Sequence, residues 1–110
     1  MSNALSLTGS YLTEGEVDQM PVPIRQVEPE FPSIMRRAKL DGTAFVVLVV
    51  SATGKPEQVQ ANQATHELFA EAAVRAVQQW EFKPGMKDGK PVATMITVPI
   101  QFQAEFQNTF

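Results

Sequence analysis

The sequence predicts an α+β fold in which two helices pack on one face of a small, about three-stranded antiparallel sheet. Three patterns predict it. Apolar residues recur with the period of a helix over residues 66–79, and they alternate with the period of a strand over residues 92–106. A valine-rich run at residues 43–51 supplies a second strong strand. Helices interspersed among antiparallel strands bury their apolar stripes against the sheet, which makes two layers.

Composition limits the chain to one compact domain and excludes several classes of function. The 110 residues, 44% of them hydrophobic, are enough for one core. A net charge of -3 argues against nucleic acid as a partner, because a phosphate backbone attracts a basic excess. With no cysteine and one histidine, disulfides and a multi-histidine metal site are excluded, and we expect no cofactor. No catalytic triad or phosphate loop is visible, so we expect no enzyme.

The first part of the chain, residues 1–20, is polar and poorly periodic, and it is predicted to be a flexible lead-in with a short strand near residues 10–13. Ser2-Asn3-Ala4 is compatible with a remnant of an expression vector. No run approaches the roughly 18 apolar residues that cross a bilayer, and no signal peptide is visible. If Ser2-Asn3-Ala4 is such a remnant, the chain is a piece of a longer protein and any membrane anchor lies outside it; the alternative is an orphan domain used in another context.

A proline-rich segment and a short helix are predicted next. Residues 21–32 should run extended, because proline fixes φ and disfavours a helix in the residue before it. A helix is then expected over about residues 32–40, with Pro32 in its first turn and Gly42 ending it. Its predicted apolar face consists of Phe31, Ile34, Met35 and Ala38.

The valine-rich run carries apolar side chains on both faces of the predicted strand. Ala44, Val46, Leu48 and Val50 line one face, and Phe45, Val47 and Val49 line the other. Such a strand is either covered on both sides, or covered by helices on one side and in part by a neighbouring chain on the other. A turn at residues 53–56 leads to a weaker strand over about residues 58–64, which completes a hairpin.

The second helix has the most regular pattern in the chain. It is predicted over about residues 66–79, and Thr65 is expected to cap it. Its buried face should contain Phe69, Ala72, Ala73, Ala76, Val77 and Trp80. We expect Trp80 and Phe82 in the core, and His66 as a surface or capping residue.

The last strand is expected after a loop at residues 82–91. A strand over all of residues 92–106 would exceed the usual length, so part of it should project beyond the sheet. Pro99 places the strand at an edge or at a bulge, because proline cannot donate a hydrogen bond to a neighbouring strand.

An ordered set of residues over about 21–106 carries a resemblance to a known family. The set comprises Phe31-Pro32, Gly42, Gly54, Phe69, Ala72, Ala73, Trp80, Phe82, Pro84, Gly85, Gly89, Pro91, Val92, Pro99, Ile100 and Phe102. No single motif in it is specific, whereas the order and the spacings are. The set resembles the TonB C-terminal domain family, and residues 21–110 are accordingly expected to form such a domain.

The resemblance implies a protein-binding function. It implies a periplasmic domain of an inner-membrane-anchored transducer in a Gram-negative bacterium, which couples the ExbB–ExbD motor to TonB-dependent outer-membrane transporters. The transporter's TonB box would pair as an added strand at the positions that match Ile100, Gln101, Phe102, Gln103, Ala104 and Glu105. The segment Glu28, Pro29 and Glu30 matches a region that also contacts the transporter. The resemblance also allows a homodimer through the C-terminal strands.

Two other functions stay open on the sequence. The chain can be a structural or oligomerisation module of another cell-envelope protein with no transporter partner, because an open strand edge recruits further copies. An N-terminal membrane helix and a proline-rich spacer in the parent gene would favour the transducer over this module. An enzyme is the third alternative, and nothing in the sequence forms a catalytic constellation.

Overall fold

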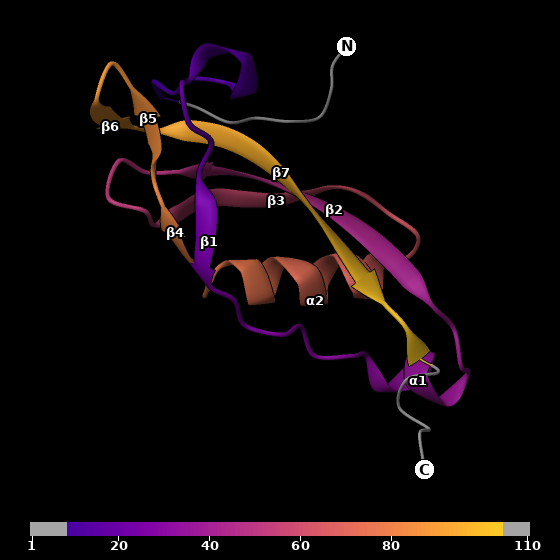
Figure 1. Cartoon of the computed structure of the whole chain (residues 1–110). Helices are drawn as coiled ribbons and strands as arrows, with labels where there is room; N and C mark the ends of the chain where they lie inside the picture. Colours follow the sequence, from indigo (N-terminus) through magenta and orange to yellow (C-terminus); the bar gives the residue numbers. More distant parts are fainter. Residues whose placement is uncertain (1–8, 105–110) are drawn as a thin grey trace.

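A three-stranded antiparallel sheet forms the centre of the protein (Figure 1). The computed structural model describes residues 9–104. The strands lie in the order β3 (Pro56–Ala64), β2 (Gly42–Val50) and β7 (Thr94–Phe102), so β2 is central and β7 is at an edge. The predicted combination of helices with an antiparallel sheet is confirmed.

Four short strands that the sequence did not predict form two further antiparallel pairs. β1 (Val22–Arg25) pairs with β4 (Glu81–Lys83), and β5 (Gly85–Lys87) pairs with β6 (Lys90–Val92). The prediction of a loop at residues 82–91 is therefore wrong. Three-residue strands are too short to show an alternating pattern, although the Asp88-Gly89 turn between β5 and β6 is a hairpin signal. Both of its residues have positive φ, 52° and 77°, which a type I′ turn requires.

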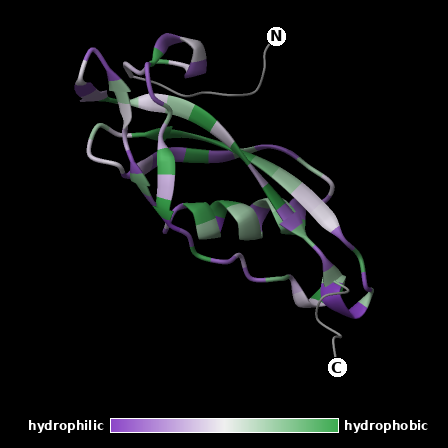
Figure 2. Ribbon diagram, in the orientation of Figure 1, coloured by the Kyte–Doolittle hydropathy of each residue, from purple (hydrophilic) through white to green (hydrophobic). Residues whose placement is uncertain are grey.

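α2 (Glu67–Val77) lies against one face of the sheet (Figure 1). The predicted stripe is confirmed, since each of its members is buried: Phe69, Ala72, Ala73, Ala76, Val77 and Trp80. Figure 2 shows hydrophobic residues on α2 and on the strands next to it. The core therefore lies between α2 and the sheet.

The cap of α2 is His66 and not Thr65. The imidazole Nδ1 of His66 accepts a hydrogen bond of 3.0 Å from the N–H of Leu68. The predicted cap, Thr65, instead accepts a 3.2 Å bond from the N–H of Thr43 through its hydroxyl, and its own N–H donates to the carbonyl of Thr43. Because Thr65 is bonded to Thr43 at the start of β2, its hydroxyl does not cap the helix.

α1 (Ser33–Arg37) lies at one end of the sheet and is shorter than predicted (Figure 1). Met35 is buried and Phe31 is half-buried, as expected, but Ile34 and Ala38 are exposed, so the predicted apolar face is half wrong. A helix of five residues reaches the core with one side chain only. Pro32 precedes the first helical residue as its N-cap instead of lying in the first turn.

α1 ends at Arg37, with Ala38 as its C-cap, and the prediction that Gly42 stops it is wrong. The N–H of Leu40 donates to the carbonyl of Met35, and the N–H of Lys39 donates to that of Arg36. These two bonds define a Schellman motif, in which Lys39 takes the left-handed position with φ 56°. Gly42 has another role, because a Cβ at this position would overlap the ring of Phe69.

Replacing Lys39 by glycine should raise the free energy of unfolding by about 0.5–1 kcal/mol, because glycine removes the Cβ that disfavours positive φ. Lys39→Ala is the matched control, since alanine also removes the charge but keeps the Cβ. Urea denaturation of both variants measures the difference. Equal stability of the glycine and alanine variants would refute the assigned role of the backbone conformation.

The second face of β2 is only partly covered. Val47 and Val49 are buried there, as expected, whereas Phe45 is 39% exposed. The opposite face is buried throughout, at Ala44, Val46, Leu48 and Val50. The two faces of β2 are therefore not covered equally. Helices cover one face, and the other face is accessible around Phe45.

The lead-in contacts the domain along its described part, residues 9–20. A 3₁₀ turn, η1 (Glu14–Glu16), follows one isolated bridge at Leu12, which takes the place of the short strand expected near residues 10–13. The N–H of Asp18 donates to the carbonyl of Met86, and the carboxylate of Asp18 accepts a 2.8 Å bond from the N–H of Asp88. These contacts join the lead-in to the β5–β6 pair.

Candidate functional site

β7 offers an open edge on the side that faces away from β2. Its register with β2 is unbroken from Thr94 opposite Val50 to Phe102 opposite Gly42. Within residues 9–104, Leu12 is the one further residue that pairs with β7, through a parallel bridge to Thr94. The rest of the edge is free to accept another strand, and the prediction of an edge strand from Pro99 is confirmed.

The bridge at Leu12 shows which backbone groups of β7 face outward. Leu12 accepts a 2.8 Å bond from the N–H of Met95 and donates a 2.9 Å bond to the carbonyl of Ala93. Backbone groups alternate along a strand, so Thr97 and Gln101 also turn their N–H and C=O toward the open edge. Pro99 belongs to the same outward-facing series, so its missing N–H removes no hydrogen bond from the pairing with β2.

Residues 26–31, here called the flanking segment, run between β1 and α1 beside this edge (Figure 1). Two anchors hold the flanking segment. The indole N–H of Trp80 donates a 2.9 Å hydrogen bond to the carbonyl of Val27. At its other end, the ring of Phe31 meets the rings of Phe69 and Phe102 edge-on, with centroids 5.8 Å apart in both pairs. The residues between these two anchors, Glu28 to Glu30, are therefore held at both ends.

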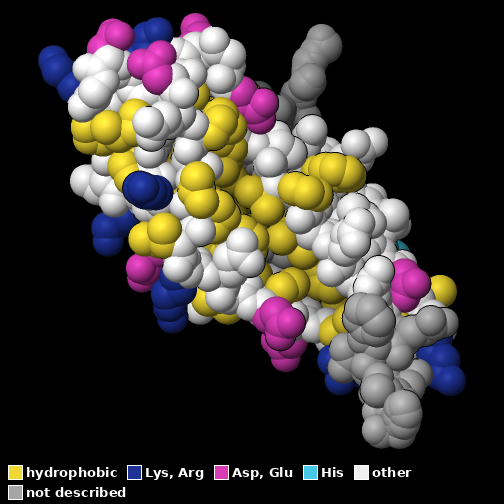
Figure 3. Space-filling view, viewed as in Figure 1, with side chains coloured by type: hydrophobic (Ala, Val, Ile, Leu, Met, Phe, Trp, Pro, Cys, Tyr) yellow, Lys and Arg dark blue, Asp and Glu magenta, His cyan; other side chains and the backbone are white. Residues whose placement is uncertain are grey.

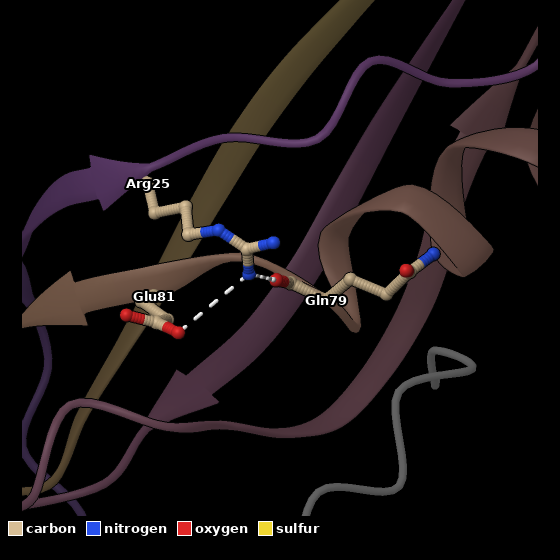
Figure 4. A network of polar contacts seen from close by, with 3 residues as sticks. All are labelled: Arg25, Gln79 and Glu81. Carbon is tan, nitrogen blue, oxygen red and sulfur yellow. Dashed lines mark hydrogen bonds and ion pairs between the residues drawn. The ribbon is translucent and has the colours of Figure 1, made fainter.

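A small polar network lies where the flanking segment begins. Arg25 of β1 approaches the carboxylate of Glu81 at 3.6 Å and the carbonyl of Gln79 at 3.5 Å (Figure 4). The two charged side chains are 61% and 60% exposed. An ion pair this exposed adds little stability. It lies where the backbones of Arg25 in β1 and Glu81 in β4 already pair, next to the residues that follow α2.

Two hollows separate the flanking segment from the open edge. The first, here called the apolar hollow, has a volume of about 400 Å³, and its apolar lining includes Val27, Pro29, Trp80, Val98 and Ile100. The second, the polar hollow, has about 350 Å³ and is lined by Glu28, Glu30, Arg36, Gln101 and Gln103 among others. In Figure 3, hydrophobic side chains form a band along the diagonal that β7 takes across this face.

The charges near the polar hollow are mixed. Glu28 and Glu30 are exposed carboxylates, and the guanidinium of Arg36 lies 5.5 Å from the centre of the Phe31 ring.

At the other end of the edge, hydrogen bonds from the backbone N–H and the hydroxyl of Thr13 lower the pKa of Glu16. Nothing in this arrangement resembles paired acid and base groups around a common point.

The structure brings the two predicted contact segments together. Glu28 and Pro29 line both hollows with Gln101, and Glu30, Phe102 and Gln103 line the polar one. The six predicted edge positions differ in exposure, however. Ile100, Phe102 and Ala104 are buried, whereas Gln101 and Gln103 are exposed. The N–H of Ala104 is already bonded to the carboxylate of Asp41 at 2.8 Å, and Glu105 lies outside the described residues.

Sequence reasoning missed four residues that shape this site. Thr97 was not singled out, although the strand alternation places it at the open edge. Val27, Trp80 and Val98 line the apolar hollow, but the sequence marks them only as core or extended residues. The signal for Thr97 was available, because Pro99 had already identified the outward-facing series.

The described part of the chain offers neither a metal site nor a membrane span. Among residues 9–104, no group of three His, Cys, Asp or Glu side chains is placed to hold a metal ion. No helix in the same range combines the length and the apolar character that crossing a membrane requires.

Comparison with known proteins places the chain in a family. The family described as Gram-negative bacterial TonB protein C-terminal matches residues 27–104. The protein named TonB from Vibrio cholerae is 34% identical over 91 residues, which is 81% of this chain and 37% of that protein. The protein named tonB2 from Pseudomonas aeruginosa is 33% identical over 76 residues, 68% of this chain and 28% of that protein. The chain thus spans only a minor part of these relatives.

Solved structures agree in fold. The solution structure of the Pseudomonas aeruginosa TonB C-terminal domain superimposes with a TM-score of 0.65 at 21% identity, and it covers 86% of this chain and 95% of its own. The tonb2 protein from Vibrio anguillarum gives 0.58 at 24% identity, with 94% and 92% covered. Together with the family match over most of the domain, these likenesses lead to one conclusion: the chain belongs to the family of Gram-negative bacterial TonB C-terminal domains.

Proposed function

We propose that this chain is the periplasmic coupling domain of a TonB-type energy transducer. An anchor outside the chain would hold it to the inner membrane and to an ExbB–ExbD motor. The domain would bind the TonB box of outer-membrane transporters and so drive uptake that depends on the proton-motive force. Family membership supports the transducer, and the relatives named TonB and tonB2 support the same reading.

The observation that carries the binding mode is the open edge of β7. Thr97 and Gln101 turn unshared backbone donors and acceptors outward, and the anchored flanking segment leaves space beside them. An extended peptide that enters this space adds a fourth strand, and its backbone bonds supply the affinity. Leu12 already uses the same edge in this way at the start of β7.

Strand addition is also suited to transmitting force. A segment paired along β7 and pulled along its own length loads several hydrogen bonds at once, in shear. The antiparallel pairing of β7 with β2, unbroken over nine residue pairs, then carries the load into the central strand. A contact through one side chain would concentrate the same load on a single interaction.

The test is an amide NMR titration of the domain with TonB box peptides from transporters of the same organism. We expect the largest shifts at Thr97, Gln101 and Gln103 and in the flanking segment. The sample must be shown to be monomeric, because a second copy of the chain would compete for the same edge. A monomeric domain that responds to no box peptide would favour the structural or oligomerisation module instead.

A pair of variants separates backbone pairing from side-chain contact. Gln101→Pro removes the outward N–H and should weaken peptide binding about tenfold, because a partner carbonyl is left without its donor. Gln101→Ala removes the side chain but keeps that N–H, and it should bind nearly as the parent domain does. Equal loss in both variants would contradict pairing through the backbone at this position.

A further inference from the structure

We infer that the bound segment places one apolar side chain in the apolar hollow, and that this position selects among peptides that pair equally well through their backbones. The inference rests on the proposed function, since it concerns a strand added to β7. It names a specificity-determining subsite formed by Val27, Trp80, Val98 and Ile100.

The geometry of a sheet determines which side chains can reach this subsite. Side chains alternate between the two faces of a strand, and neighbours across strands share a face. Val98 and Ile100 point to the face that carries α2, where both belong to or pack against the core. A side chain of the added strand that lies beside them points to the same face, and it enters the hollow in front of Val27 and Trp80.

The next side chains of the added strand meet different surroundings. Those one residue away lie on the opposite face, beside Thr97, Pro99 and Gln101, which are exposed. The side chain two residues along returns to the first face, but toward Phe102 it reaches the polar hollow between Glu30 and Arg36. Of these positions of the added strand, the one beside Val98 and Ile100 therefore has the most apolar surroundings.

The hollow is already formed in the free domain, which favours a defined preference. Its back wall is held by the hydrogen bond from Trp80 to the carbonyl of Val27. Its floor, Val98 and Ile100, is held by the pairing of β7 with β2, opposite Val46 and Ala44. A hydrophobic side chain that enters a preformed site loses contact with water without the cost of ordering the walls. A polar side chain there would lose its water and gain few partners.

An extended occupant is indicated by the chain itself. Leu12, from the lead-in, is seated on the same edge as a parallel bridge, with hydrogen bonds to Ala93 and Met95. The chain then turns away, because the Thr13–Glu16 bonds close the 3₁₀ turn. The edge beyond Met95 and the two hollows are thereby left to a second extended segment.

The experiment is a serine scan of one TonB box peptide, with dissociation constants measured by calorimetry on the parent domain. We expect one apolar position at which serine weakens binding at least tenfold, while serine at the positions directly before and after it weakens binding less than threefold. The indole N–H resonance of Trp80 should shift with the parent peptide, and this shift should shrink for the peptide substituted at that position.

Two domain variants with matched chemistry complete the test. Val98→Thr puts a hydroxyl into the apolar hollow and should reduce the penalty for serine at the selected position to less than threefold. Val59→Thr makes the same exchange in β3, the strand at the far edge of the sheet, where the valine also packs against the core, and it should leave the scan unchanged. Both residues are β-branched and lie in an edge strand, so both variants should fold.

The outcomes distinguish the inference from the proposed function. Peptides that bind with the same small penalty at every position would overturn the apolar subsite and leave strand addition intact. The apolar subsite would also be overturned if serine at the selected position weakened binding to Val98→Thr as much as to the parent domain. In that case the hollow would not be the source of the preference. If no peptide binds at all, the proposed function itself fails, and the preference fails with it.

Discussion

Replacing Phe69 by alanine should lower the free energy of unfolding by about 3–5 kcal/mol, the cost of removing a large buried side chain and leaving a cavity. The ring is 2% exposed. It contacts Phe102 with a centroid distance of 4.7 Å, and it meets Phe31 edge-on at 5.8 Å. The substitution therefore removes the central member of a cluster that joins α2, β7 and the flanking segment.

The same change should also weaken peptide binding, because Phe31 and Phe102 form part of the wall of the polar hollow. Phe45→Ala is the control, since this phenyl group is 39% exposed and lies on the other face of the sheet. It should cost less than half as much stability. Chemical denaturation of the two variants under the same conditions gives the comparison. Similar losses in the free energy of unfolding would show that the ring cluster stabilises the fold no more than the exposed ring does.

The elements that the sequence predicted correctly are those long enough to show a period. α2 repeats its apolar stripe over three turns, β7 alternates over nine residues, and β2 is a continuous apolar run rich in valine. For α2 and β7, burial then follows from the pattern, because each of them has one way to turn its apolar side chains inward. The helix ends were less predictable, since Thr65 and Gly42 are good terminating residues that the tertiary structure uses for other contacts.

The candidate site was predictable in part. Pro99 indicates an edge strand or a bulge from the sequence alone, because its missing N–H cannot take part in a regular central pairing, and the structure shows the edge strand. The hollows beside that edge were not predictable. They lie between β7 and the flanking segment, which is anchored by the bond from Trp80 to Val27, two residues 53 positions apart. No local pattern in residues 26–31 contains that information, so the apolar subsite appears only when the fold is known.

Gly54→Ala should lower the free energy of unfolding by about 2–5 kcal/mol, from two separate causes. Gly54 has φ 88°, a conformation that costs an L-residue about 1–2 kcal/mol. In addition, a Cβ would overlap the carbonyl oxygen of Phe82, and forced overlap in a packed region costs about 1–3 kcal/mol. That oxygen belongs to the backbone of β4, whose N–H at Phe82 is bonded to the carbonyl of Gly54 at 3.0 Å. It cannot turn away as a flexible side chain would.

Gly89 allows the two causes to be separated. Its φ is also positive, at 77°, but nothing lies within 4 Å of the Cβ that alanine would add. Gly89→Ala should therefore cost the conformational part alone, about 1–2 kcal/mol. Thermal unfolding of both variants measures the difference, with each kcal/mol lowering the Tm of a domain of this size by roughly 4–8 °C. If Gly54→Ala melts at the same temperature as Gly89→Ala, the close approach of the 51–54 turn to β4 is not a constraint. If it melts lower, the turn between β2 and β3 is packed against β4 tightly enough to require glycine.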